Sequence, residues 1–529
     1  MPKDIDTGVE IRHAGERDLR DVARFLEKES DQFPIPLADK VDIPEYAEKM
    51  LKLGKVLVAT ASGEVAGVSG GYANDSVGGR AYLSVIVVDS ERRGTGVSGD
   101  LLERFEEAAR FEGMLFCSLE THETNARALA FYRKRGYAIE GPAKAEGNLS
   151  LKKRLAWLTP ARPNVLLTSA GRRTYLVEWF KEALGGHGEV LAVNSDPKSP
   201  AMLAADFSER SPLIYSEEYV PFLLDFCNRH RVGAVIPLFD IDIPVLAAHR
   251  SEFVRAGVFP VVAPEGFARA CADKLATAQL LASAGILHPA TYDGADGFMQ
   301  AVRCGESAFP AFVKPRWGMG SIGIATASDE AELRAQCAVA ERKVAATYLK
   351  YESAAEPSRT VVVQPAVNGD EYGMDVICDL DGSYRACVVR RKLAMRAGET
   401  DAAEVIEPDE RFVALARRLA EISHHPGNMD VDLFDVEGDL MVLEMNARFG
   451  GGYPFSHAAG VDLPAATVSW LRGEECDFAD LEAKRFGCYA KDISVVSLNQ
   501  NRRVVANPIA DRNSEDGSRD IEGNARREA

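Results

Sequence analysis

Acidic and amide side chains gather near the C-terminal end of the sequence in a pattern suited to holding a metal ion. Residues 430–434 and 440–446 have the pattern of two strands, and the Glu-Gly pair between them fits a tight hairpin turn. Residues two apart on a strand share a face, so Glu444 and Asn446 point the same way, while Asp432 comes from the adjacent strand. Oxygen ligands of these types bind Mg²⁺ together with nucleotide phosphates. We therefore predict a magnesium–nucleotide site on this hairpin.

Two lysines on separate elements supply positive charge for such a nucleotide. Lys274 opens a helix, and Lys314 lies on a strand that runs into a glycine-rich loop at residues 318–323. Lysines neutralise phosphates, and glycines let a loop close over them. A further strand at 361–367 leads into a loop that carries Glu371. These features predict a cleft that binds a nucleotide triphosphate.

The order of these features resembles the ATP-grasp superfamily over roughly residues 164–490. The most similar members are carbamoyl-phosphate-synthase-like carboxylate–amine ligases, such as the pyrrolysine-pathway ligase. The run Glu-Met-Asn-Ala-Arg-Phe-Gly-Gly-Gly-Tyr-Pro at 444–454 is its most specific part. The resemblance implies an ATP-dependent enzyme that turns a carboxylate into an acyl phosphate, which an amine then attacks to form an amide.

Site residues carry over from the resemblance by position. It implies that Lys274 and Lys314 hold the ATP phosphates, that Gln364 and Val367 line the adenine slot, and that Glu371 binds the ribose. Mg²⁺, or Mn²⁺ in its place, would be ligated by Asp432, Glu444 and Asn446. Asp430 competes with Asp432, because relatives differ in hairpin length.

Arginines complete the resemblance. Arg448 would stabilise the acyl phosphate and its transition state. Residues 389–400 look like the arginine-rich turn of this subgroup, in which Arg391 and Arg396 would face the substrate carboxylate or the transferred phosphoryl group. Guanidinium forks suit both anions. The alternative interpretation of this run is a solvated charged surface.

A second candidate site lies near the N-terminus. A strand at 82–88 runs into a basic turn with Arg93, Gly94 and Gly96, and then into a helix with an apolar face. Glycines let backbone amides approach a diphosphate, and the helix N-terminus adds the positive end of its dipole. The order strand, glycine turn, helix predicts an anion-binding site of moderate specificity.

Residues 8–154 as a whole resemble the GCN5-related N-acetyltransferase (GNAT) family, through the Arg-Gly-Thr-Gly turn and the segment from Asn125 to Tyr137. The resemblance implies that Asn125 contacts the pantetheine arm of acetyl-CoA and that Tyr132 protonates the departing thiolate. A packed core aromatic is the alternative for Tyr132. The residues it implies around coenzyme A are Val88, Arg93, Gly94, Gly96, Val97 and Ser98.

One feature departs from the GNAT pattern. Many members carry a glutamate on the strand before the coenzyme A turn, whereas residues 82–88 contain no carboxylate. Glu120 or His122 on the next strand could deprotonate an amine through water. The sequence therefore leaves two alternatives for this domain, an acetyltransferase or a regulatory module that binds acetyl-CoA without transfer.

The elements that position these residues indicate an α/β multidomain fold. Short apolar runs beginning at 165, 190, 234 and 258 alternate with helical patterns and predict a doubly wound parallel sheet. The turn at 169–173 could bind an anion or be purely structural. We expect a GNAT domain with a mixed sheet, a parallel-sheet preATP-grasp domain and an α+β ATP-grasp domain. The expected bounds are 1–157, a linker at 158–163, 164–265, 266–499, and a disordered tail at 500–529.

Composition bounds the partners. A net charge of −18 argues against a non-specific nucleic-acid binder. Nine cysteines without a CxxC pair suit a reducing compartment, and no apolar run is long enough for a membrane span, so we expect a cytoplasmic protein without membrane or nucleic-acid partners. The expected substrates are a small carboxylate and an amine, both amino-acid-like. The expected cofactors are ATP, Mg²⁺ and acetyl-CoA, and a homodimer is one oligomeric state that we consider. For the ATP-dependent domain, phosphorylation or carboxylation without amide formation is the alternative to a ligase.

Overall fold

The computed structural model describes residues 9–75, 79–318, 323–396 and 398–492. The chain forms two compact units: Met1–Trp157 with Val254–Gly257 and Leu471–Glu474, and the remainder from Leu158 onward. The expected tail at 500–529 and residues 319–322 of the glycine-rich loop lie outside the described residues.

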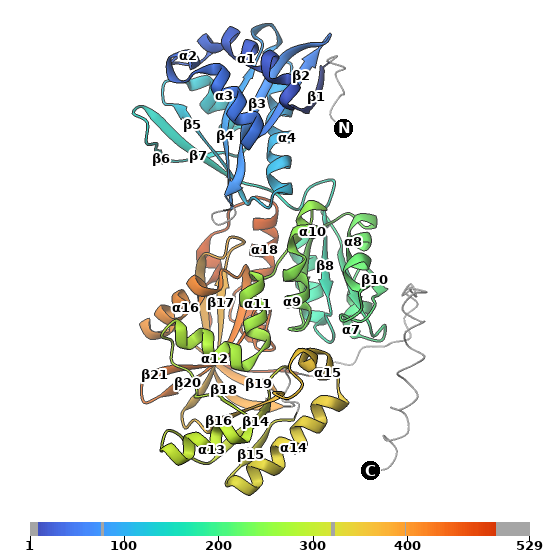
Figure 1. Cartoon of the computed structure of the whole chain (residues 1–529), viewed down its shortest axis with the longest axis vertical. Coiled ribbons are helices and arrows are strands. Elements are labelled where there is room, and N and C mark those ends of the chain that lie inside the picture. The colour runs from blue at the N-terminus through green and yellow to red at the C-terminus, as the bar shows by residue number, and fades with distance from the viewer. Residues whose placement is uncertain (1–8, 76–78, 319–322, 397, 493–529) are drawn as a thin grey trace. The chain divides into compact units, whose positions relative to one another are not determined.

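The N-terminal unit is a mixed sheet with helices on both faces (Figure 1). The strand order is β1-β2-β3-β4-β5-β7-β6, and β4 and β5 are parallel. Helices α4 and α5 share one apolar core with the sheet, and α1 and α3 share the other. The strands are β1 (Val9–His13), β2 (Lys55–Ala61), β3 (Glu64–Asp75), β4 (Arg80–Val88), β5 (Phe116–His122), β6 (Ala138–Pro142) and β7 (Asn148–Arg154). The helices are α1 (Leu19–Lys28), α2 (Leu37–Lys40), α3 (Ile43–Leu53), α4 (Val97–Phe111) and α5 (Ala126–Arg133).

Strands β4 and β5 separate partway along their length. Their pairing runs from Arg80↔Phe116 to Leu83↔Leu119, although both strands continue beyond it. At the same point β4 carries an extra residue, Ser84, relative to β3. A bulge of this kind bends a strand and re-aims its side chains. The split leaves one edge of β4 unpaired by β5 from Ser84 to Val88.

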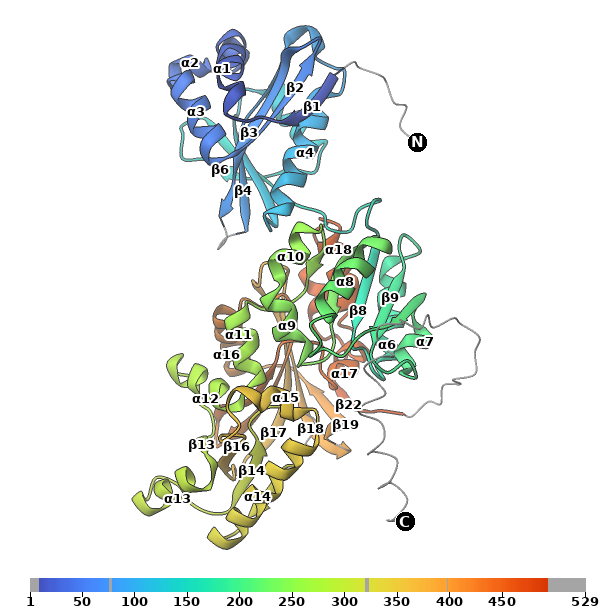
Figure 2. The same ribbon diagram turned by 45° about the vertical axis from the view of Figure 1, so that its right-hand side comes forward.

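The second unit begins with a five-stranded parallel sheet in the order β10-β9-β8-β11-β12. Figure 2 shows α6 and α7 on one side of β8 and β9, and α8 and α9 on the other. The doubly wound prediction is confirmed, but β10, a polar strand at the sheet edge, was not predicted. The strands are β8 (Asn164–Thr168), β9 (Val190–Asn194), β10 (Phe207–Arg210), β11 (Val232–Pro237) and β12 (Phe259–Pro260). The helices are α6 (Thr174–Leu184), α7 (Pro200–Ala204), α8 (Tyr219–Arg229), α9 (Asp242–Ala248) and α10 (Arg250–Arg255).

Two antiparallel sheets complete the second unit, ordered β13-β16-β14-β15 and β21-β20-β17-β18-β19-β22. Helices α13 and α14 share a core with the smaller sheet, and α16 packs on the larger. The smaller sheet contains β13 (Tyr292–Asp293), β14 (Ala311–Pro315), β15 (Ala325–Ala327) and β16 (Val361–Pro365). The larger contains β17 (Asp370–Cys378), β18 (Tyr384–Arg396), β19 (Glu399–Ile406), β20 (Gly427–Val436), β21 (Asp439–Asn446) and β22 (Gly487–Ala490). The helices are α11 (Glu265–Ala272), α12 (Lys274–Ser283), α13 (Gly294–Cys304), α14 (Glu330–Ala346), α15 (Leu349–Glu352), α16 (Glu410–Ser423), α17 (Tyr453–Ala458) and α18 (Leu463–Leu471).

The hairpin of β20 and β21 has the predicted turn. Glu437 and Gly438 both have positive φ, 53° and 99°, which fits the two-residue turn that matches strand twist. Its register places Asp432 opposite Glu444 and Asp430 opposite Asn446. The four residues named from their spacing therefore lie on adjacent strands at one end of the hairpin.

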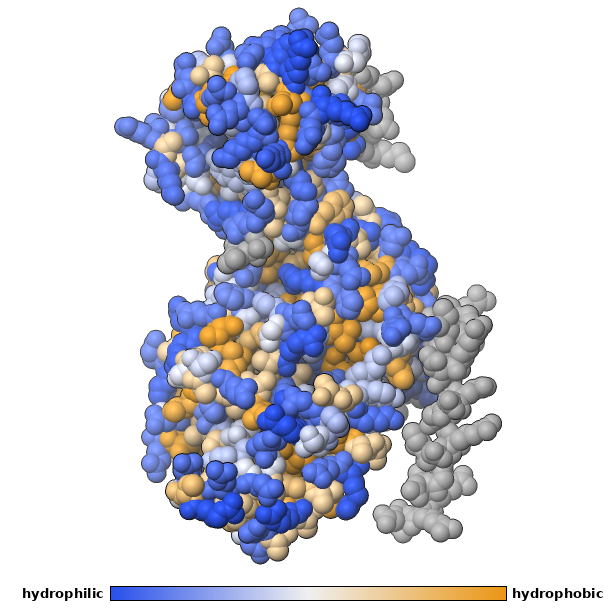
Figure 3. Space-filling model, in the orientation of Figure 1, coloured by the Kyte–Doolittle hydropathy of each residue, from blue (hydrophilic) through white to orange (hydrophobic). Residues whose placement is uncertain are grey.

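On the face drawn in Figure 3, polar residues dominate and apolar residues are scattered among them. Among the described residues, no helix has the length and apolar character required to cross a membrane.

Candidate functional site

A cleft of about 270 Å³ lies between the two antiparallel sheets and the parallel sheet of the second unit. Its charged and amide lining comes from all three layers. The basic members are Arg173, Lys274, Lys314, Arg390, Lys392 and Arg448, and the acidic and amide members are Glu371, Glu399, Asp430, Asp432, Glu444 and Asn446. The structure thus brings together most of the residues predicted for ATP and metal binding.

Both predicted phosphate-binding lysines have neutral partners. Lys274 Nζ donates to the carbonyl of Gly318 at 2.7 Å, and Lys314 Nζ donates to Gln364 Oε1 at 2.8 Å. Burial lowers the pKa of Lys314 to about 8. Asp273 caps the helix of Lys274 and also binds the guanidinium of Arg316 at 2.7 Å, which fixes the position of the helix start. Both lysines thus donate their hydrogen bonds to neutral groups, although Lys274 Nζ also lies 4.0 Å from the carboxylate of Glu444.

The carboxylates of the hairpin differ in their surroundings. Asp432 Oδ1 lies 2.7 Å from Lys392 Nζ, which also donates to Glu371 at 2.7 Å. Glu444 lies 4.0 Å from Lys274 Nζ. The side chains of Asp432 and Glu444 are each 27% exposed, whereas that of Asp430 is 13% exposed. Two carboxylates are therefore open to the cleft and one is enclosed.

A metal ion fits this donor set only with additional ligands. In the part of the chain that the structure describes, no three His, Cys, Asp or Glu side chains form a preformed metal site. Asp432, Glu444 and the Asn446 amide offer hard oxygens on adjacent strands. Mg²⁺ commonly takes one or two carboxylates and completes its shell with phosphate oxygens and water. The residues present fit that mode of binding.

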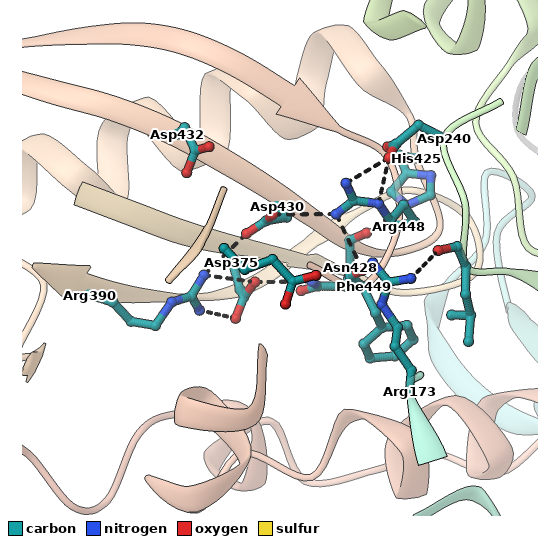
Figure 4. Close-up of polar contacts among 12 residues, drawn as sticks. Arg173, Asp240, Asp375, Arg390, His425, Asn428, Asp430, Asp432, Arg448 and Phe449 are labelled. Atoms are coloured by element: carbon teal, nitrogen blue, oxygen red, sulfur yellow. Dashed lines mark hydrogen bonds and ion pairs between the residues drawn. The ribbon is translucent and has the colours of Figure 1, made fainter. Parts of the chain in front are cut away.

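The enclosed carboxylate, Asp430, binds two buried arginines (Figure 4). Arg448 reaches it at 3.4 Å and Arg390 at 3.2 Å. Burial, together with the charge of Asp432, raises the pKa of Asp430 to about 6, although Arg448 and Arg390 act to lower it. Burial by itself would lower the pKa of Arg448, but Asp240 and Asp430 outweigh it and hold that pKa above its ordinary value. Both guanidinium groups are therefore charged and fixed in place.

Each arginine has a second anchor. Arg448 donates to Asp240 Oδ2 through Nε at 3.0 Å and through Nη2 at 2.7 Å. Arg390 pairs with the fully buried Asp375 and donates to Ser456 Oγ at 2.6 Å. Figure 4 shows these contacts as one continuous chain of side chains from Asp240 to Asp375. Asp240 belongs to the parallel-sheet layer, so this layer helps to position an arginine of the cleft.

Arg173 and Asp240 follow neighbouring strands of the parallel sheet. Arg173 comes after β8 and Asp240 after β11, and the strand order reverses direction between these two strands. Ligand sites of open α/β sheets lie at such switch points, outside the carboxyl ends of the strands. Applied to the predicted sheet, this rule could have indicated Arg173 and Asp240 as candidate site residues. In the turn at 169–173, the Ser169 hydroxyl binds Asp242 at 3.2 Å and Arg173 reaches the cleft.

The glycines after Arg448 leave room for the arginine network. A Cβ on Gly450 would overlap the carboxylate of Asp430, and one on Gly452 would lie 2.8 Å from the guanidinium of Arg390. Real Cβ atoms do not approach other heavy atoms so closely. The triplet that carried the family resemblance thus has a packing reason in this chain.

Four predicted residues lie outside the cleft lining. Arg391 points to the opposite face of β18 from Arg390 and Lys392 and donates to Glu404 at 2.5 Å, and Arg396 pairs with Asp401. Gln364 is buried behind Lys314 and donates to Thr291 at 2.9 Å. Val367, after β16, does not line the cleft either. Arg390 and Lys392, the alternate residues on β18, are the ones that face the cleft, and the two-residue period of a strand could have indicated them.

A second cavity, of about 400 Å³, opens in the N-terminal unit where β4 and β5 separate. Val88, Ser98, Asn125 and Tyr132 line it. Gly94 and Gly96 have positive φ of 82° and 101°, and Gly96 caps α4. Within the described residues, the backbone N–H groups of Gly96, Val97 and Ser98 have no recorded acceptor, as expected at the start of a helix. Arg93 is exposed beside this turn.

These features fit an acyl-CoA. The open amides and the dipole of α4 suit a diphosphate, and the unpaired edge of β4 suits an amide-containing arm. Asn125 also caps α5, with its Oδ1 accepting from Ala128 N at 3.1 Å. Burial raises the pKa of Tyr132, so its phenol stays protonated and can act as a proton donor. Glu120 and His122 both line the cavity.

Comparisons with known proteins match each part of this description. Residues 22–137 match the acetyltransferase (GNAT) family, residues 165–262 the PylC-like N-terminal domain, and residues 357–495 the ATP-grasp family of a biosynthetic pathway with the Ter operon. An IAA acetyltransferase of Azospirillum brasilense is 34% identical over 124 residues, 23% of this chain and 76% of that protein. Acetyl-CoA carboxylase 1 of Oryza sativa is 29% identical over 176 residues, 31% of this chain but only 7% of that protein.

A solved structure supports the fold of the second unit. It is the biotin carboxylase domain of 2-oxoglutarate carboxylase from Hydrogenobacter thermophilus, bound to MgADP and bicarbonate, with a TM-score of 0.50, 16% identity, and coverage of 61% of this chain and 73% of that one. The matches divide the chain into an N-terminal part similar to GNAT acetyltransferases and a C-terminal part similar to PylC-like and ATP-grasp proteins. The chain belongs to the GNAT acetyltransferase family through its N-terminal part, and its later residues match the PylC-like and ATP-grasp models over 165–262 and 357–495.

Proposed function

We propose that the ATP-grasp domain joins a small carboxylate to an amine, with ATP converted to ADP and phosphate. One observation carries this proposal: two lysines, two buried arginines and two partly open carboxylates line the same cleft. A carboxylate oxygen of the substrate forms a bond to the γ-phosphorus while the bond to the β,γ-bridging oxygen breaks and ADP leaves. The amine nitrogen then bonds to the acyl carbon, the bond from that carbon to the phosphate oxygen breaks, and the amine gives up a proton.

The residues divide the work by charge and exposure. Lys274 and Lys314 hold the ATP phosphates, and Glu371 takes the ribose. Asp432, Glu444 and Asn446 hold Mg²⁺, which when bound polarises the phosphate oxygens. Asp430 is more enclosed and already binds two arginines, so we assign it to the arginines rather than to the metal.

Arg448 and Arg390 stabilise the negative charge that develops on the transferred phosphoryl group and on the acyl phosphate. Because their partners fix them before the substrate arrives, little reorganisation is needed during the reaction. In place of Arg391, which faces away from the cleft, we assign the second arginine role to Arg390. Gln364 acts through Lys314, which it binds at 2.8 Å.

The test is product identification with ATP, Mg²⁺ and pairs of amino acids, by mass spectrometry for an amide and by a coupled assay for ADP. Glu444→Gln should lower ADP release at least about 100-fold, since a charged ligand of the metal is lost. Glu330→Gln is the matched control, because Glu330 is exposed on α14 and pairs only with Arg334 there. AMP or a carboxylated product, or full ATP turnover by Glu444→Gln, would refute the assignment.

We propose further that the N-terminal domain transfers acetyl from acetyl-CoA to an amine. The open amides at the start of α4, the split between β4 and β5, and the buried phenol of Tyr132 support this activity. The absence of a carboxylate on β4 favours the rival function, acetyl-CoA binding without transfer. Coenzyme A release in the presence of amines separates the two: Tyr132→Phe should lower kcat about 10- to 100-fold without weakening acetyl-CoA binding, whereas Tyr72→Phe, outside the cavity, should not.

The domain division proposed with these functions is 1–157 for the acetyltransferase, 158–163 for the linker, 164–265 for the PylC-like domain and 266–499 for the ATP-grasp domain.

A further inference from the structure

The acetyltransferase cavity has two ends of different chemistry. Val88 and Ser98 lie beside the open amides of α4, at the end expected for the coenzyme A diphosphate. Tyr82 lies six residues back along β4, about 20 Å away at the rise of an extended strand. The acyl acceptor therefore enters at the Tyr82 end, near the point where β4 and β5 separate.

Apolar and aromatic side chains form much of the wall of this cavity. They come from the segment after α1, from α3, from β4 and from α5, and they include Phe33, Ile35, Tyr46, Tyr82 and Phe131. The segment after α1 reaches the Val88 end, where Gln32 Nε2 donates to the carbonyl of Val88 at 3.1 Å. Tyr46 donates to or accepts from Ser84 Oγ at 2.6 Å, which holds α3 against the bulge of β4. Ile35 is 41% exposed and Tyr82 is 38% exposed, so both present apolar surface that a bound molecule could cover.

Glu120 is the one carboxylate among the described residues that line this cavity. Its recorded hydrogen bond in the described chain is a long one, from Asn148 Nδ2 at 3.4 Å. Tyr82 is paired with Ser118 of β5, and Glu120 lies two residues beyond Ser118, so the side chains of Tyr82 and Glu120 lie on the same face of the sheet and both line the cavity. Burial and the charge of Glu120 both raise the pKa of Tyr82. An ammonium group is attracted both to a carboxylate and to the face of an aromatic ring.

We propose that the acceptor is a primary amine carried on an aryl-alkyl body, with its ammonium at Glu120 and its ring against Tyr82 and Tyr46. This inference deepens the proposed acetyltransferase activity and rests on it. Glu120 takes one proton from the ammonium, and the amine nitrogen then bonds to the acetyl carbonyl carbon. The carbon–sulfur bond breaks, the thiolate takes the proton of Tyr132, and the nitrogen loses its second proton, which restores the phenol of Tyr132 through solvent.

The experiment compares 2-phenylethylamine with ethanolamine, using the full chain, acetyl-CoA and detection of the released thiol. A hydrophobic pocket distinguishes substrates by about 10- to 200-fold per methylene, so kcat/KM should be at least 10-fold higher for 2-phenylethylamine. Tyr82→Ala should reduce this preference to less than threefold while leaving the KM for acetyl-CoA unchanged. Phe111→Ala is the control, because Phe111 is 41% exposed and does not line this cavity.

The role of Glu120 has its own readout. Glu120→Gln should lower kcat at least 10-fold and remove the acidic limb of the pH profile, an effect that a merely structural role would not produce. The inference would be overturned by equal kcat/KM for the two amines, by a preference for ethanolamine, or by a Tyr82→Ala variant in which kcat/KM falls equally for both amines. Each of these results would leave the acetyltransferase proposal standing. Release of coenzyme A with neither these nor other primary amines, with acetyl-CoA still bound, would overturn both.

Discussion

The contact between Asp240 and Arg448 predicts that a substitution of Asp240, which follows strand β11 of the parallel sheet, lowers the activity of the ATP-grasp domain. Arg448 is 8% exposed and donates twice to Asp240 Oδ2, at 3.0 and 2.7 Å. Its other carboxylate partner, Asp430, is more distant at 3.4 Å. The position of Arg448 therefore depends chiefly on Asp240. The stabilisation of the acyl phosphate that we propose for Arg448 should depend on this contact.

The size of the effect follows from the kind of bond removed. Hydrogen bonds that involve a charged group contribute about 1.5–3 kcal/mol each. Asp240→Asn keeps one oxygen acceptor but removes the negative charge, so a loss of about 1.5–3 kcal/mol in the transition state is expected, or roughly a 10- to 100-fold lower kcat. Asp240→Ala leaves the buried guanidinium without this partner, and breaking such a pair costs about 3–5 kcal/mol of stability.

The assay is ADP release at saturating ATP, with KM for ATP measured in parallel. Asp240→Asn should lower kcat while changing KM for ATP less than about threefold, because in the described part of the chain Lys274 and Lys314, the lysines proposed to hold the phosphates, hydrogen-bond to Gly318 and Gln364 and not to Asp240. Asp225→Asn is a matched control: Asp225 binds Arg229 at 2.6 Å, but it is 64% exposed. Wild-type kcat in a folded Asp240→Asn enzyme would refute the idea that this contact positions Arg448 for catalysis.

Three further predictions concern the same cleft. Burial lowers the pKa of Lys314 to about 8, so its charge is present below that pH and lost above it; KM for ATP should rise at least threefold from pH 7 to 9, and Lys314→Arg should abolish the rise. Asp432→Asn should raise the Mg²⁺ concentration needed for half-maximal activity about 10-fold. Asp430→Asn should lower kcat and leave that Mg²⁺ concentration unchanged; the opposite pattern would reverse the roles assigned to the two aspartates. Gly450→Ala should abolish ADP release because its Cβ would overlap Asp430, while Gly266→Ala, where a Cβ meets nothing within 4 Å, should retain it.

Lys314 also affects the stability of the fold. A rise in pH weakens the expected binding of ATP by Lys314, but it increases the contribution of Lys314 to the free energy of unfolding. Its folded-state pKa of about 8 lies below the ordinary value of 10.5, so the unfolded chain holds more protons between these two values. The contribution of Lys314 to the free energy of unfolding therefore increases as pH rises through this window.

Local features of the fold could be predicted from the sequence because they depend on short-range periodicity. The hairpin of β20 and β21 needed only two apolar runs and a Glu-Gly turn, and the structure has that turn with positive φ at both residues. The parallel sheet followed from the alternation of apolar runs with helical patterns, and only the polar edge strand β10 was missed. The shared face of Glu444 and Asn446 follows from the two-residue period of a strand.

The composition of the site depended on contacts that no local period encodes. Arg390 and Arg391 are adjacent in sequence, and only the pairing of β18 with its neighbours decides that Arg390 faces the cleft and Arg391 faces Glu404. Asp240 reaches Arg448 across 208 positions of sequence. Such contacts arise when packed layers bring the ends of distant elements together. The sequence by itself therefore determined the kinds of residue at the site and their order, and the tertiary structure decided which of them share a cleft and which carboxylate holds the arginines.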